Sequence, residues 1–382
     1  MSDRAPGDDP RRPEWASDEA GSEFASRVIG SAERGGGGPR GEGGPPHQRR
    51  RLEIDEHVEG VLSGDRTVLA RTITLVESDS PAHLARAQEV LRRLLPHAGG
   101  SIRIGVTGVP GVGKSTFIEA LGTRLLDRGH RVAVLAIDPS SRRTRGSILG
   151  DKTRMETLGR DPRCFIRPSP TGGALGGVAR KTRESIAVCE AAGHDVVLVE
   201  TVGVGQSEVE ARSMVDFFLL LLLAGAGDEL QGIKRGVMEL ADALCINKAD
   251  GPNRERAAGA RAEYERALHF LPPATRGWTT VVRSCSSLSG EGIDEVWEVV
   301  ERFRERAETT GALQERRRRQ ALDWMRAMLE EKLVGEFFAD EEVKKTLPGA
   351  EREVAEGRLP VTAAVQELLA ARDRSIGRAE ED

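Results

Sequence analysis

The feature that most constrains this chain is a glycine loop set between an apolar run and a helix-like segment. The loop reads Gly-Val-Pro-Gly-Val-Gly-Lys-Ser over residues 108–115, follows the apolar run 102–106 and precedes helical spacing at 116–129. This G-x-x-x-x-G-K-S/T pattern is typical of loops whose backbone N–H groups cradle phosphates at a helix N-terminus. A chance match in a turn explains the flanking strand and helix less well. The sequence therefore predicts a site for a nucleoside triphosphate.

Two side chains of this loop have expected roles of their own. Lys114 is expected to reach the β- and γ-phosphates, and the Ser115 hydroxyl is expected to bind Mg²⁺. The nucleotide-binding residues predicted in the loop are Gly108, Gly111, Val112, Gly113, Lys114, Ser115 and Thr116.

Short β-branched runs alternate with helical stretches between residues 101 and 304. The runs cover residues 101–108, 131–138, 195–201, 217–223, 243–248 and 279–286. Such alternation predicts an α/β fold with a mostly parallel sheet and helices on both faces. The apolar run at 215–225 is shorter than the roughly 20 residues that cross a bilayer, so we interpret it as a buried strand.

The base is indicated by Asn247-Lys248-Ala249-Asp250, which follows a strand-like run. The Asp250 carboxylate can accept hydrogen bonds from N1–H and the 2-amino group of guanine, whereas adenine has no such donor pair. N-K-x-D is a weak pattern alone, but its place about 130 residues after the glycine loop makes the joint pattern specific for GTP. A weaker match, expected to close over the guanine, is formed by Ser284, Cys285 and Ser286.

A third element follows the run 195–200. Glu200 is expected at the carboxyl end of this strand, facing the nucleotide, and the Gly203 N–H is expected to contact the γ-phosphate. Val204 stands where small Ras-like GTPases have the glutamine that orients the attacking water. Another group or a partner protein must therefore orient the water.

Two further acids, Asp138 and Asp151, are candidates for binding the metal and the attacking water. The alternative interpretation of each is a helix cap or a turn residue.

Composition divides the chain into four expected parts. Residues 1–51 combine Gly, Pro, Ser and mixed charge with few large apolar side chains, which predicts a disordered tail. Residues 52–98 have helical spacing and are expected to form a helical amino-terminal domain. Residues 99–305 hold the expected P-loop core, and residues 306–382 an expected helical extension that packs on the core, on a second copy of the chain, or on both.

Charge and cysteine content exclude several function classes. The chain has 56 basic and 61 acidic residues and a formal net charge of -5, which favours neither a nucleic-acid nor a membrane partner. Its four cysteines form no C-x-x-C pair, which disfavours a zinc site and suits a reducing compartment. The tail is rich in acids and has no apolar signal core, so a cytoplasmic location is expected. We interpret the arginine run 316–319 as a solvated helix face or an inter-subunit pairing surface rather than a nucleic-acid patch.

These blocks resemble the MeaB/MMAA (ArgK-type) family of P-loop GTPases. The resemblance spans residues 55–330 and is carried by GVTGVPGVGKST, AIDPSSRRTRGSILGDKTRM, RPSPTGGALGGVARKTRE, VLVETVGVGQSEVE, AGAGDELQGIKRGVMELAD and NKAD. The resemblance implies the GTPase class that includes signal-recognition and metal-insertion GTPases, and a homodimer held by the C-terminal extension. It also implies a chaperone of an adenosylcobalamin-dependent acyl-CoA mutase of the methylmalonyl-CoA mutase type, with the adenosyltransferase as a further candidate partner.

The resemblance also implies roles for particular residues. It assigns catalysis to Lys114, Asp151 and Glu200, and Mg²⁺ binding to Ser115, Asp138, Asp151 and Glu200. A third switch that relays the GTP or GDP state to the mutase is expected at Asp228, Gln231 and Lys234. The chain departs from the family pattern at Arg142 and Arg145, where Thr and Gly are usual, and at Ala224, where Pro is usual.

Three other functions compete with this interpretation. One is a kinase or ATPase of an amino-acid transport system, which requires an acceptor pocket that no sequence segment declares. Another is a GTP-dependent binding module with incidental hydrolysis, which Val204 favours. A nickel-insertion GTPase is disfavoured because His130, His194 and Cys164 are isolated rather than clustered.

Overall fold

The computed structural model describes residues 50–137, 155–168, 175–201, 206–224 and 235–379. The elements below all lie within residues 52–382, which form one compact unit.

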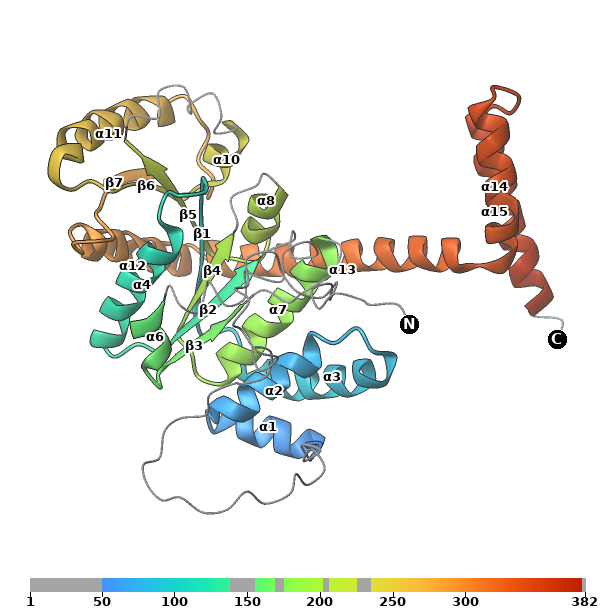
Figure 1. The fold of residues 1–382 in the computed structure, drawn as a ribbon, viewed down its shortest axis with the longest axis horizontal. Coiled ribbons are helices and arrows are strands. Elements are labelled where there is room, and N and C mark those ends of the chain that lie inside the picture. Colours follow the sequence, from blue (N-terminus) through green and yellow to red (C-terminus); the bar gives the residue numbers. More distant parts are fainter. Residues whose placement is uncertain (1–49, 138–154, 169–174, 202–205, 225–234, 380–382) are drawn as a thin grey trace, which may run out of the picture. The chain divides into compact units, whose positions relative to one another are not determined.

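A seven-stranded parallel sheet forms the centre of the unit (Figure 1), in the order β3-β2-β4-β1-β5-β6-β7. Its strands are β1 (Ile102–Gly108), β2 (Val132–Ile137), β3 (Cys164–Arg167), β4 (Val196–Thr201), β5 (Phe217–Leu223), β6 (Ala243–Asn247) and β7 (Val281–Ser284). Both faces of a parallel sheet are covered by helices, so its strands read as nearly continuous apolar runs. The α/β fold class expected from the sequence is confirmed.

Register places the expected site residues on neighbouring strands. Val106 of β1 pairs with Glu200 of β4, and Gly108 of β1 pairs with Leu221 of β5. The carboxyl ends of these strands therefore meet at one edge of the sheet, where ligands bind in open α/β sheets.

One strand was missed by the sequence interpretation. The edge strand β3 has four residues and, among the described strands, pairs with β2 alone, where Val132 lies opposite Cys164. It is shorter than the typical strand of five or six residues and carries no long apolar run. The strand β3 is defined by its pairing with β2, about 30 residues earlier in the chain, and not by a local sequence pattern.

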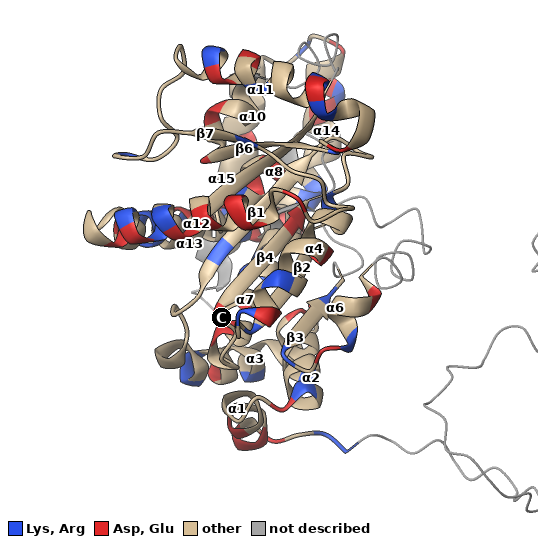
Figure 2. Ribbon diagram, turned by 90° about the vertical axis from the view of Figure 1, so that its left-hand side faces the viewer, with Lys and Arg blue, Asp and Glu red and all other residues tan. Residues whose placement is uncertain are grey.

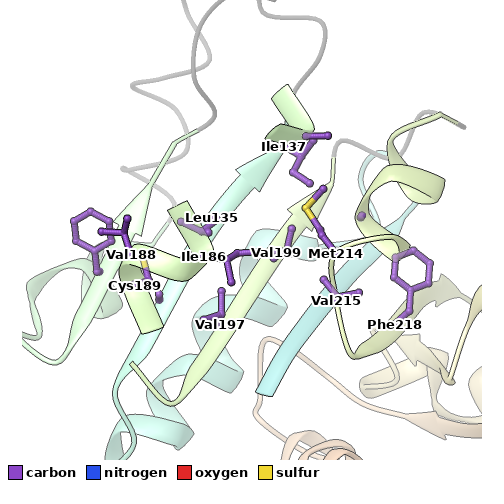
Figure 3. Packing of buried hydrophobic residues seen from close by; sticks show 14 of the residues in the cluster. Leu135, Ile137, Ile186, Val188, Cys189, Val197, Val199, Met214, Val215 and Phe218 are labelled. Atoms are coloured by element: carbon purple, nitrogen blue, oxygen red, sulfur yellow. The ribbon is translucent and has the colours of Figure 1, made fainter. Parts of the chain in front are cut away.

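Helices cover both faces of the sheet with separate hydrophobic cores. One face packs against α4 (Lys114–Asp127), α6 (Glu156–Arg160) and α12 (Ile293–Thr309). The other packs against α7 (Leu175–Ala191), α8 (Gln206–Arg212), α10 (Arg235–Leu240) and α11 (Arg254–Leu268), and Figure 3 shows part of this core. Side chains of β4 alternate between them, because Val197 and Val199 belong to the second core and Val196 and Leu198 to the first.

Between residue 50 and the sheet, the structure has the helices α1 (Ile54–Leu62), α2 (Arg66–Val76) and α3 (Pro81–Leu94), followed by the 3₁₀ turn η1 (Leu95–His97). Asp65 caps α2 by accepting from the Thr67 and Val68 N–H groups, and Pro81 occupies the first turn of α3. Apolar side chains of these helices belong to the same hydrophobic core as the buried side chains of α7. The boundary at residue 98 remains a prediction.

The chain ends in α13 (Ala312–Ala339), α14 (Glu341–Ala355) and α15 (Val361–Ala379), with α14 and α15 side by side at the far end of α13 (Figure 1). Basic and acidic residues are interspersed along α12 and α13 (Figure 2). Among the described residues, no helix is both long enough and apolar enough to cross a membrane.

The interpretation of the arginine run is wrong for two of its members. Arg316 and Arg317 are mostly buried and bind Asp216 and Thr275 of their own chain, whereas Arg318 is exposed. The cause is the buried Asp216 carboxylate, which lies about 100 residues earlier in the chain and needs a cationic partner. Local charge pattern cannot reveal such a partner.

Candidate nucleotide site

The glycine loop joins β1 to α4 at the carboxyl edge of the sheet. Gly108 has φ 148°, and a Cβ there would lie 2.5 Å from the Leu221 carbonyl oxygen. Gly113, at the N-cap of α4, has φ 96°, and a Cβ there would lie 2.9 Å from Asn247 Nδ2. Both positions therefore need glycine for conformation and for space. The loop turns the chain so that α4 begins with its N-terminus at this edge.

Lys114 lies folded over the loop. Its ammonium donates to the carbonyl oxygens of Gly108 at 2.8 Å and Val109 at 3.3 Å. Burial lowers the pKa of Lys114, while the nearby carboxylates of Glu200 and Glu208 act in the opposite direction and favour its charged form. A buried ammonium held between backbone oxygens and two acids suits the electrostatic task expected of this lysine.

Ser115 and Glu200 meet in front of α4. The Ser115 hydroxyl donates to Glu200 Oε1 at 2.9 Å, which joins the first turn of α4 to the end of β4. A hydroxyl and a carboxylate oxygen side by side are hard oxygen donors of the kind that Mg²⁺ prefers. The residues that the structure describes here fit the expected metal.

The base-reading segment is fastened to the glycine loop by two contacts. Asn247 Nδ2 donates to the Val112 carbonyl at 2.9 Å, and Lys248 Nζ donates to the Gly111 carbonyl at 2.8 Å. Lys248 has φ 58°, a left-handed conformation that turns the chain sharply after β6. The phosphate-binding and base-reading segments thus form one connected unit.

The loop after β7 reaches the same unit, but not with all three expected residues. The Ser286 hydroxyl donates to Asp250 Oδ2, and Cys285 offers its carbonyl to the Ala249 N–H at 3.0 Å. Ser284 lies in β7, and its buried hydroxyl has no hydrogen-bond partner among the described residues. The structure adds Ser287, whose hydroxyl donates to Asn247 Oδ1 at 2.8 Å.

A chain of buried hydroxyls beneath the site was not expected from the sequence. The Thr201 hydroxyl donates to Thr107 Oγ1 at 2.8 Å, and the Thr107 hydroxyl donates to Glu208 Oε1 at 3.4 Å. Glu208 is 5% exposed and lies in α8. The only sequence signal for this contact was an acid, Glu208, shortly after the glycines of the expected switch. The hydroxyl chain links β1, β4 and α8 next to the glycine loop.

Several expected residues cannot be placed. Six lie outside the described residues: Asp138, Asp151, Gly203, Asp228, Gln231 and Lys234. The same holds for the departures at Arg142 and Arg145. Thr116 is exposed in the first turn of α4, and the Val112 side chain is fully buried. Every other expected site residue except Ser284 belongs to the connected unit at the carboxyl edge.

Comparison with known proteins matches this arrangement to one family. The family model described as methylmalonyl-CoA mutase-associated GTPase MeaB matches residues 69–342. GTPase ArgK of Escherichia coli K12 is 49% identical over 76% of this chain and 87% of its own length. The mouse protein named methylmalonic aciduria type A homolog, mitochondrial, is 44% identical over 83% of this chain and 79% of its own length.

The fold comparison agrees. A crystal structure of a LAO/AO transport system kinase superposes with a TM-score of 0.68 at 39% identity, and the match covers 83% of this chain and 96% of that one. The likeness therefore extends over the sheet and most of the helices rather than over the glycine loop alone.

Proposed function

The chain belongs to the family of methylmalonyl-CoA mutase-associated GTPases, and from this premise we propose that it is a GTP-dependent chaperone of an adenosylcobalamin-dependent acyl-CoA mutase. It is a GTP hydrolase. In the proposed role, its nucleotide state gates loading of the cofactor into the mutase and protects or reactivates the mutase. The adenosyltransferase that prepares the cofactor is a further proposed partner.

The observation that carries the nucleotide part of this proposal is the contact between the two recognition segments. Asn247 and Lys248 bind backbone carbonyls of the glycine loop, and Ser286 holds the Asp250 carboxylate. Guanine recognition at Asp250 therefore fixes where the phosphates lie relative to Lys114. This preorganisation supports GTP as the substrate.

The proposed metal ligands are Ser115 and Glu200, completed by Asp138 and Asp151. Mg²⁺ bound there neutralises charge on the β- and γ-phosphates. Lys114 binds the same phosphates; burial lowers its pKa, and the Glu200 and Glu208 carboxylates oppose that shift by favouring the charged form. Hydrolysis on this site is a matter of positioning and charge stabilisation.

Water orientation is left to a group other than Val204, whose side chain has no donor or acceptor. We assign the orientation of the attacking water to Asp151 within the chain, and we propose that binding of the mutase stimulates hydrolysis. Asp228, Gln231 and Lys234 form the proposed switch that relays the nucleotide state to the mutase.

A homodimer is proposed from the surface of α13. This helix has 28 residues and only Leu313 is buried, while large apolar side chains are exposed along it. They are Leu322, Met325, Met328, Leu329, Leu333, Val334 and Phe338. Four of them, Leu322, Met325, Leu329 and Leu333, recur at helical spacing and form an exposed apolar stripe on one side of α13. Such a stripe is typical of an interface, and a second copy of the chain is the proposed partner.

A binding experiment tests the chaperone role. The affinity for purified methylmalonyl-CoA mutase is measured with GDP and with a non-hydrolysable GTP analogue, and we expect it to differ at least about fivefold between the two nucleotides. Lys114→Ala is expected to abolish this difference, and Lys344→Ala, an exposed position on α14, to preserve it. Absence of binding with either nucleotide contradicts the proposal.

The kinase alternative is decided in the same samples with GTP labelled at the γ-phosphate. Label released only as inorganic phosphate supports the GTPase chaperone. Label transferred to the mutase, to a substrate-binding protein or to an amino acid overturns it.

A further inference from the structure

The carboxyl end of α8 is held by the first turns of α13. Gln320 of α13 donates from Nε2 to the carbonyl oxygens of Arg212 at 3.1 Å and Val215 at 2.9 Å. These two carbonyls flank the turn that leads from α8 into β5. One amide side chain thus fixes the backbone where α8 ends.

A buried carboxylate binds α8 and α13 at the same place. Asp242 is fully buried before β6; its carboxylate forms an ion pair with Arg212 of α8 at 3.1 Å and lies 3.6 Å from Arg316 of α13. Arg316 also donates to the Asp216 carbonyl and to Thr275 Oγ1. Arginines from two helices share one buried acid, so neither helix shifts without disturbing the other's partner.

The other end of α8 reaches the nucleotide site. Glu208, in its first turn, accepts from Thr107, the residue directly before Gly108 of the glycine loop. Helix α8 has seven residues, which corresponds to a rigid rod of roughly 10 Å. It connects the carboxyl edge of the sheet, where GTP binds, to the opposite edge, where α13 begins.

Space beside this joint permits movement. A cavity of about 850 Å³ lies between α8, α13 and the loop before β7, lined among others by Ser213, Thr275 and Gln320. Tightly packed interiors resist small shifts, whereas a cavity leaves a helix end room to change position. The joint is therefore held by direct polar contacts that border this space.

We propose that Gln320 is a positioning residue for GTP hydrolysis, which acts through α8 and couples the nucleotide site to the orientation of α13. The inference deepens the proposed function, because it names how nucleotide state reaches the C-terminal helices. Coupling is reciprocal: if GTP binding shifts α13, a partner that holds α13 changes GTP affinity by the same factor.

The test compares Gln320→Leu with Gln314→Leu in the full chain without mutase. Gln314 is exposed on the same helix and, among the described residues, makes no side-chain hydrogen bond to α8. Gln320→Leu is expected to lower kcat for GTP about three- to tenfold, the effect of roughly one lost hydrogen bond, while KM for GTP and Kd for GDP stay within about twofold. Gln320→Glu, which keeps the size but loses both N–H donors, is expected to behave the same way.

A distance measurement separates coupling from mere structural support. Spin labels are placed at Glu298→Cys in α12 and Glu353→Cys in α14, since the four native cysteines are buried. Labelled chains are diluted into unlabelled ones. The parent and Gln314→Leu are expected to show different label distances with GDP and with a non-hydrolysable GTP analogue, and Gln320→Leu to show the same distance with both.

Two results would overturn the proposal: a nucleotide-dependent distance that survives in Gln320→Leu, or equal distances in the parent. Neither involves the mutase, so failure here leaves the chaperone role standing.

Discussion

At the scale of single residues, the proposed recognition of guanine depends on the Asp250 carboxylate and on the Ser286 hydroxyl that binds it. Ser286 donates to Oδ2 of Asp250, which orients the carboxylate, and both carboxylate oxygens still have a lone pair free to accept from the base. A carboxylate read in this way separates guanine from adenine because only guanine presents two adjacent donors.

Asp250→Asn is therefore expected to lower GTP affinity at least about 100-fold. The amide donates where the carboxylate accepted, so the variant is expected to gain affinity for xanthosine triphosphate, which has a carbonyl at the 2-position. Titration calorimetry with both nucleotides measures this, with Asp127→Asn, an exposed position at the end of α4, as the control. Unchanged GTP affinity in Asp250→Asn removes the base-reading role.

Residues of the site differ in how far their place can be predicted from sequence. The glycine loop and Asn247 to Asp250 were predictable because each is a short contiguous segment whose conformation is set by its own residues. The contact of Glu208 with Thr107 joins residues 101 positions apart, so no local pattern carries it. Ser287 was missed for the same reason, since its partner Asn247 lies on the neighbouring strand.

At the scale of elements, the sheet was predictable and the attachment of α13 was not. Six of the seven strands lie in runs that the sequence predicts as strands, and five of them, β1, β2, β4, β5 and β6, are mostly apolar and buried on both faces. The start of α13 is instead fixed by Arg317, which binds the buried Asp216 carboxylate and the carbonyls of Gly99 and Ser101. Burial alone lowers the pKa of Arg317, and the Asp216 carboxylate outweighs it and raises the pKa.

Arg317→Met is expected to reduce the free energy of unfolding by about 3 kcal/mol, since it leaves the Asp216 carboxylate buried without its cationic partner. Chemical denaturation at neutral pH measures the change. Arg318→Met, one residue further on an exposed face, serves as the control and is expected to change stability by less than about 0.5 kcal/mol. Equal effects of the two substitutions contradict the anchoring role of Arg317.

At the scale of the whole molecule, the apolar surface of α13 predicts assembly. Leu329→Lys places a charge within the exposed apolar stripe and is expected to convert the proposed homodimer to a monomer, because an unpaired charge in an interface is costly to desolvate. Sedimentation velocity measures the mass. Glu330→Lys, an adjacent exposed position, is the control. A parent protein that sediments as a monomer over the micromolar range contradicts the proposed dimer.

The rate of GTP hydrolysis depends on both the nucleotide site and the proposed mutase partner, since Val204 supplies no group to orient the attacking water. The decisive measurement is the turnover number for GTP with and without purified methylmalonyl-CoA mutase. We predict slow turnover by the protein alone and at least about tenfold stimulation at saturating mutase. A turnover number that the mutase leaves unchanged would contradict the account.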